Sequence, residues 1–167
     1  MFTVCFTHAT TTPSQPGLSQ LVEAALADCG AERTGLEAEI RLSDGALLYM
    51  FGEDAPDGML AEYPVLTPAI AAALLAVLRR TNSFMLDGPG GRLLVRPAGN
   101  VGEPRTPLMY EVELREVEDA DALTDLLKGL RNNRSTTPSR PQSSPSRTPA
   151  RAKPGFSITD FLFGKAV

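Results

Sequence analysis

The sequence predicts an α+β fold, in which an antiparallel sheet combines with three helices in the order α-β-β-(β)-α-β-β-β-α. Three segments repeat apolar residues at intervals of three and four, which is typical of helices that cover a core. Short segments between them alternate apolar and polar residues and are separated by Asp-Gly and Gly-rich turns, as in antiparallel hairpins. Residues 1–131 form the predicted domain, residues 132–155 a disordered linker and residues 156–167 a hydrophobic C-terminal motif.

The chain is expected to begin with a short strand followed by a helix. Phe2, Val4 and Phe6 alternate with smaller or polar residues, which predicts a strand over residues 2–8. Residues 18–29 then have helical spacing. Gly30 favours a helix end there, because glycine accepts the left-handed conformation that often follows a last turn.

Two or three strands are expected next. Apolar and charged residues alternate over residues 36–42, the Asp44-Gly45 pair favours a tight turn, and residues 46–51 supply the returning strand. A further Asp-Gly pair precedes residues 59–65, which are predicted to be a third strand.

The strongest predicted helix covers residues 68–81. Thr67 is suited to its N-cap, and Pro68 is suited to its first position, where a missing N–H costs nothing. Apolar residues occupy more than one face of this helix, so it must be covered on more than one side. Two interpretations stay open: a core helix packed on the sheet, or a helix whose one face meets a second subunit.

The remaining segments predict a second group of strands and a last helix. Residues 83–86 and 92–96 flank a Gly-rich turn, and residues 108–116 alternate as a third strand. Residues 119–130 then form an amphipathic helix with acidic residues in its first turn, which favours the helix dipole. The glycines at 88–91 predict a hairpin turn and not a phosphate loop, because a phosphate loop opens a helix and a strand follows here.

Charge divides the chain into two parts. Residues 1–131 carry 19 acidic and 10 basic side chains, a balance of −9, and residues 132–167 carry 1 acidic and 6 basic, a balance of +5. An acidic domain repels phosphate backbones, so nucleic acid is not expected as its partner. The basic tail is able to fold back on the acidic domain or to touch nucleic acid weakly.

No reactive constellation is evident, so we expect no enzyme and no cofactor, catalytic residue or metal site. His8 is the only histidine and is expected to be exposed or half-buried, and Cys5 and Cys29 are expected to be free thiols. The longest apolar run, residues 69–78, is too short to cross a bilayer, and residues 1–12 do not resemble a signal peptide. These features favour a cytoplasmic protein without membrane insertion.

The tail changes composition abruptly. Ser, Thr, Pro and Arg dominate residues 132–155, so this linker has almost nothing to bury and is expected to be disordered. The motif that follows concentrates five large apolar residues, which either dock on the chain's own domain or fold on a partner. They are Phe156, Ile158, Phe161, Leu162 and Phe163.

Residues 78–84 (LRRTNSF), followed by residues 88–95 (GPGGRLLV), resemble a run in the class I chaperones of bacterial type III secretion. There, a long helix ends at an Asn, an aromatic residue follows, and a Gly-Gly turn leads into a Leu-containing strand. The order of elements over residues 18–131 is also similar. The predicted N-terminal strand and the Pro-rich tail depart from this family.

The resemblance implies a homodimer without a catalytic step, which binds the N-terminal segment of a secreted effector and keeps it competent for export. A secretion ATPase or another part of the apparatus is a further implied partner. The dimer helix would use Ile70, Leu74, Leu75 and Leu78. The client patches would draw on Leu36, Ile40, Leu42, Leu47 and Tyr49. The rival class is an immunity protein or secretion-system adaptor, which binds one folded partner.

Overall fold

A computed structural model shows, in the residues that it describes, three helices and a single sheet of eight strands, which confirms the α+β class. The last helix continues to residue 135, into the predicted linker. The hydrophobic C-terminal motif, with all five of its apolar residues, lies outside the described residues. The structure describes residues 1–10, 17–36, 38–53, 55, 58–88, 91–105 and 111–135, without the side chains of 131–135.

The sheet has the order β2-β3-β4-β5-β1-β6-β7-β8. All neighbours pair antiparallel except β7 and β8, which run parallel. The predicted N-terminal strand is confirmed, and it lies in the middle of the sheet between β5 and β6. The strands are β1 (Phe2–His8), β2 (Glu32–Arg33), β3 (Glu39–Arg41), β4 (Leu47–Phe51), β5 (Gly58–Tyr63), β6 (Ser83–Leu86), β7 (Leu93–Pro97) and β8 (Glu113–Val117).

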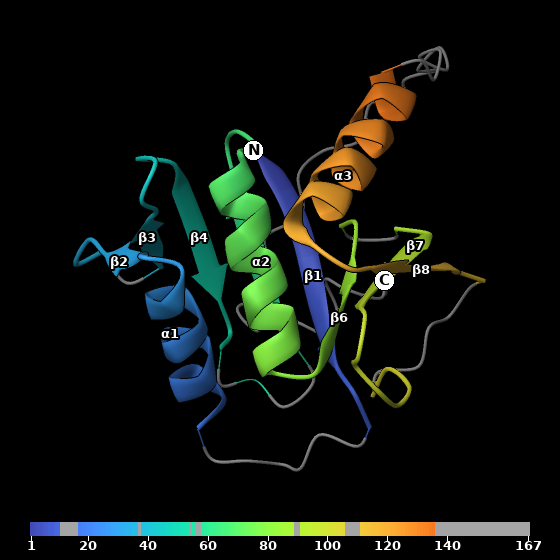
Figure 1. The fold of residues 1–167 in the computed structure, drawn as a ribbon, viewed down its shortest axis with the longest axis horizontal. Helices are drawn as coiled ribbons and strands as arrows, with labels where there is room; N and C mark the ends of the chain where they lie inside the picture. Colours follow the sequence, from blue (N-terminus) through green and yellow to red (C-terminus); the bar gives the residue numbers. More distant parts are fainter. Residues whose placement is uncertain are drawn as a thin grey trace, which may run out of the picture.

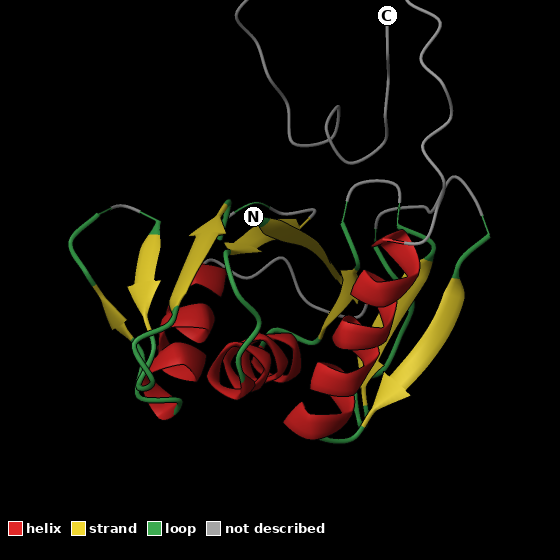
Figure 2. Cartoon of the chain, turned by 90° about the horizontal axis from the view of Figure 1, so that it is seen from above, coloured by secondary structure: helices red, strands yellow, loops and turns green. Residues whose placement is uncertain are grey.

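The helices α1 (Leu18–Asp28), α2 (Pro68–Arg80) and α3 (Ala120–Ser135) all lie on one face of the curved sheet, with α2 in the middle (Figures 1 and 2). The predicted start of α2 is confirmed, since the Thr67 hydroxyl accepts a hydrogen bond of 3.2 Å from the Ile70 N–H. Arg79 and Arg80 occupy its last turn. None of the described helices lies on the opposite face of the sheet, which we call the helix-free face (Figure 2).

The main core lies between the sheet and the helices. It includes Val4 and Phe6 of β1, Leu48 and Met50 of β4, and much of α2. A smaller cluster lies on the helix-free face and contains Cys5, Ala9, Phe84, Leu86 and Leu94. The side chains on both faces of β1 are therefore buried, in agreement with its central place in the sheet.

The four residues named for the dimer helix are all buried inside one chain. Ile70, Leu74, Leu75 and Leu78 belong to the main core and are at most 3% exposed. Their helix is covered by α1, α3 and the sheet of the same chain. The core-helix interpretation accounts for this cover, and a dimer contact through these residues stays a prediction.

The predicted antiparallel sheet is confirmed, and the described strands depart from it only at the last one, β8. After β7, residues 98–105 run back toward the end of β1, where the Arg105 N–H donates a 2.7 Å hydrogen bond to the His8 carbonyl and Ala9 forms a bridge with Pro104. His8 pairs with Ser83, and the register of β6 with β7 sets Ser83 level with the end of β7, so these contacts lie at that end of the strand. β8 begins beside Leu93, at the start of β7, and therefore runs in the same direction as β7.

Candidate functional site

A row of apolar side chains crosses the helix-free face over six neighbouring strands. Residues paired across neighbouring strands point to the same face, so the register identifies the row's members. Cys5 lies on the helix-free face because Val4 and Phe6 belong to the main core. We call the set the apolar row. In strand order it consists of Phe51, Leu60, Cys5, Leu86, Leu94 and Leu114.

The two ends of the apolar row are exposed, while its middle is covered. Phe51 is 41% exposed at one end and Leu114 is 47% exposed at the other, whereas Cys5, Leu86 and Leu94 are buried. Leu60, next to Phe51, is half-buried. The exposed ends therefore offer apolar surface in line with a covered cluster.

The Phe51 end of the row widens into a larger apolar surface along β4. Leu47, Tyr49 and Phe51 alternate with core residues, so all three lie on the helix-free face. With Leu60 they form what we call the binding face. Glu39 and Glu62 lie beside Tyr49 on the neighbouring strands. Partial burial, and then the Glu39 carboxylate, raise the pKa of the Tyr49 hydroxyl.

The structure divides the five residues named for client binding. Leu47 and Tyr49 are brought together on the binding face. Ile40 and Leu42 belong to the main core on the other side of the sheet and present no surface. Leu36 is 64% exposed, but it lies in the connection between β2 and β3 and is not part of this face.

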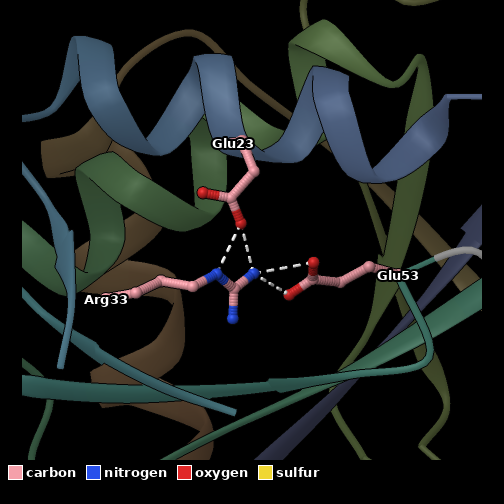
Figure 3. Close-up of polar contacts among 3 residues, drawn as sticks. All are labelled: Glu23, Arg33 and Glu53. Atoms are coloured by element: carbon pink, nitrogen blue, oxygen red, sulfur yellow. Dashed lines mark hydrogen bonds and ion pairs between the residues drawn. The ribbon is translucent and has the colours of Figure 1, made fainter. Parts of the chain in front are cut away.

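A hollow of about 610 Å³ adjoins Phe51 and has an ion-pair network on its wall. The Arg33 Nη2 lies 2.6 and 2.7 Å from the two carboxylate oxygens of Glu53, and its Nε donates a 2.5 Å hydrogen bond to Glu23 (Figure 3). Burial lowers the pKa of Arg33, but the two carboxylates outweigh it, so the pKa is raised. The network joins α1, β2 and the end of β4, and it fixes the chain next to Phe51.

A buried Ser–His pair lies at the end of α2. The His8 Nδ1 is 2.8 Å from the Ser83 hydroxyl, which is 2.7 Å from the Thr81 hydroxyl. A nucleophile must reach a substrate, and both His8 and Ser83 are fully buried. The expectation of an exposed or half-buried His8 is therefore wrong, because cross-strand pairing with Ser83 draws it into the core.

Thr81 and Asn100 give this buried cluster a structural role. The Thr81 hydroxyl donates to the Val77 carbonyl at 2.8 Å, and the Asn100 amide donates to the Leu78 carbonyl at 2.9 Å. These carbonyls belong to the last turn of α2, where carbonyls often lack a partner further along the helix. The Val77 carbonyl also accepts the Thr81 N–H at 3.0 Å, and the Asn100 amide supplies a donor for the Leu78 carbonyl. The polar cluster therefore satisfies the end of α2.

Cys5 and Cys29 are expected to react at very different rates in the folded protein. Both are free thiols. Burial, and then the Asp87 charge, raise the pKa of Cys5 from 9.0 to about 12, so its thiol stays protonated at neutral pH. Partial burial and Asp28 raise the pKa of Cys29 as well, but its side chain is half exposed. Alkylation followed by mass spectrometry should modify Cys29 first and Cys5 only on unfolding; equal rates would contradict this.

Within the described part of the chain, no group of three or more His, Cys, Asp or Glu side chains is placed to hold a metal ion. No helix in that part is long and apolar enough to cross a membrane. No protein-family model, curated protein or solved structure matches the chain. The binding face is thus assigned from its geometry alone.

Proposed function

We propose that this protein binds an extended polypeptide segment, and that it is a chaperone which keeps the N-terminal segment of a secreted effector competent for export. The observation that carries the proposal is the binding face, where Leu47, Tyr49, Phe51 and Leu60 gather partly exposed apolar surface on the side of the sheet without helices. Such a surface favours a partner that brings apolar side chains of its own.

The charges around the binding face point to the kind of segment it takes. Glu39 and Glu62 flank Tyr49, and the domain as a whole has a balance of −9. An apolar segment with interspersed Lys or Arg would place its apolar groups on Phe51 and Leu60 and its cations beside the carboxylates. Acidic segments would be repelled.

The wider setting belongs to the same proposal. The protein acts as a homodimer in the cytoplasm, and its cargo is handed to the secretion ATPase or another part of a type III apparatus. This follows the resemblance of residues 78–84 and 88–95 to the class I chaperones. The rival function, an immunity protein or adaptor, would use the same face to hold one folded partner.

A charge placed on the binding face should weaken client binding. Phe51→Asp replaces an apolar contact by a carboxylate that loses its water when the apolar groups of the segment cover it, so we expect the affinity to fall at least tenfold. The bound protein is first purified with the full chain from the native cell and identified, and its N-terminal segment is then titrated as a synthetic peptide.

Val101→Asp is the matched control, because it also replaces an exposed apolar residue by Asp, at a site outside the binding face. Circular dichroism verifies that both variants are folded. Equal affinity of the peptide for Phe51→Asp and Val101→Asp would overturn the binding face. A partner that stays folded and loses its own activity in the complex would favour the immunity protein instead.

A further inference from the structure

The last strand, β8, forms an outer edge of the sheet that the described residues build. Among the described strands it pairs only with β7. The Glu113 N–H donates to the Arg92 carbonyl at 2.7 Å, and the Val117 carbonyl accepts from Ala98 at 2.9 Å, so odd-numbered residues of β8 turn their backbone groups toward β7. Alternation along a strand then turns the N–H and carbonyl groups of Leu114 and Glu116 outward.

We infer that a second copy of this chain pairs antiparallel with this edge, with the two-fold axis at Leu114. The inference rests on the homodimer in the proposed function and names its interface. The outward N–H and carbonyl of Leu114 then bond to the carbonyl and N–H of Leu114 in the other copy. Val112 and Glu116 of opposite copies form the flanking hydrogen-bonded pairs.

The charges of β8 select this register. A two-fold axis on Leu114 places Glu113 opposite Arg115 of the other copy, twice, and no like charges face each other. An axis on Glu113, Arg115 or Glu116 would set identical charges opposite one another, and an axis on Val112 would pair Glu111 with Glu113 twice. Leu114 is thus the only centre from residue 112 to residue 116 without repulsion.

The side chains needed for the contact are free to move. Glu113 and Arg115 form an ion pair of 2.5 Å within β8, but their side chains are 61% and 59% exposed. They can turn to the second copy and exchange this pair for two cross-strand pairs. Arg96 already pairs with Glu116 at 2.7 Å, so Glu116 does not compete for Arg115.

The interface also covers the open end of the apolar row. Leu114 of each copy lies on the helix-free face beside Leu94, so the two Leu114 side chains meet at the axis. The row then runs unbroken from Phe51 of one copy to Phe51 of the other. The opposite edge, β2, is a poorer template, because it has only two residues.

The side chains of Ile70, Leu74, Leu75 and Leu78 on α2 are covered within one chain. By contrast, no second strand lies beside β8 in the described part of the chain.

The experiment measures the dimer dissociation constant of the full chain by sedimentation equilibrium. The wild-type protein is expected at twice the 17.8 kDa of one chain. Arg115→Glu places like charges opposite each other twice and should raise the dissociation constant about tenfold or more. The double variant Glu113→Arg with Arg115→Glu reverses both partners of each pair and should restore the wild-type constant.

Thermal unfolding shows that each variant is folded. The double variant separates a loss of charge complementarity across the interface from a loss of stability of the folded chain. A dimer whose constant is the same in the wild type and in Arg115→Glu would overturn the interface and leave the proposed dimer standing. A double variant as weak as the single one would also overturn it. A wild-type monomer at micromolar concentration would overturn both, while peptide binding to the face at Phe51 is measured separately.

Discussion

Replacing Gly58 by Ala is expected to lower the free energy of unfolding by about 3 kcal/mol, from overpacking of about 1–3 kcal/mol and a similar backbone strain. Gly58 begins β5 and pairs with Thr7 of the central strand. A Cβ atom at this position would lie 1.9 Å from the Phe6 carbonyl oxygen, which is backbone and cannot turn away. The φ angle of +153° is also one that side chains rarely adopt. β1 and β5 would have to separate.

Gly99→Ala is the matched control for this prediction. Gly99 has a φ of +91°, but nothing lies within 4 Å of the added Cβ, so the substitution costs only backbone strain of about 1 kcal/mol. Urea denaturation of the two variants separates the clash from the strain. Equal losses at Gly58 and Gly99 would contradict the close approach of β1 and β5 at Gly58.

The local elements could largely be predicted from the sequence, because hydrophobic periodicity and turn residues act over short range. Thr67 and Pro68 specified the start of α2, and the alternation of Phe2, Val4 and Phe6 specified β1. The central place of β1 could not be predicted, because Cys5 and Thr7 look like the half-exposed side of an edge strand. Their burial depends on the smaller cluster on the helix-free face, whose members come from distant segments.

The direction of β8 could not be predicted from the sequence either, because side chains alternate with a period of two in both parallel and antiparallel strands. The direction depends on the end of β7 at which β8 begins, which no local pattern supplies.

The binding face could be predicted in part. The sequence indicates Leu47 and Tyr49 as candidates, but it does not indicate Phe51 and Leu60. Residues 47–51 are apolar on both sides of the strand, so periodicity could not show which side faces the helices. Once Leu48 and Met50 are known to be core residues, Phe51 follows from alternation. The apolar row requires the register of six strands, which no local pattern supplies.

Leu74→Ala is expected to lower the free energy of unfolding by about 2–5 kcal/mol, because it removes a fully buried side chain from the middle of α2 and leaves a cavity. The substitution also separates the two interpretations of this helix. If Leu74 packs within its own chain, the loss is the same at every protein concentration, and the dimer dissociation constant of the folded variant does not change. If the helix joins two subunits, the constant rises and the loss depends on concentration.

Leu36→Ala removes the same atoms from a side chain that is 64% exposed, and it should change the free energy of unfolding by less than about 0.5 kcal/mol. Urea denaturation at two protein concentrations gives the free energy of unfolding of each variant. Light scattering on the folded variants gives the dimer dissociation constant. A concentration-dependent loss for Leu74→Ala would assign the dimer contact to α2 and count against the edge of β8. A loss of unfolding free energy that does not depend on protein concentration, together with an unchanged dimer dissociation constant, would leave β8 as the surface where two copies meet.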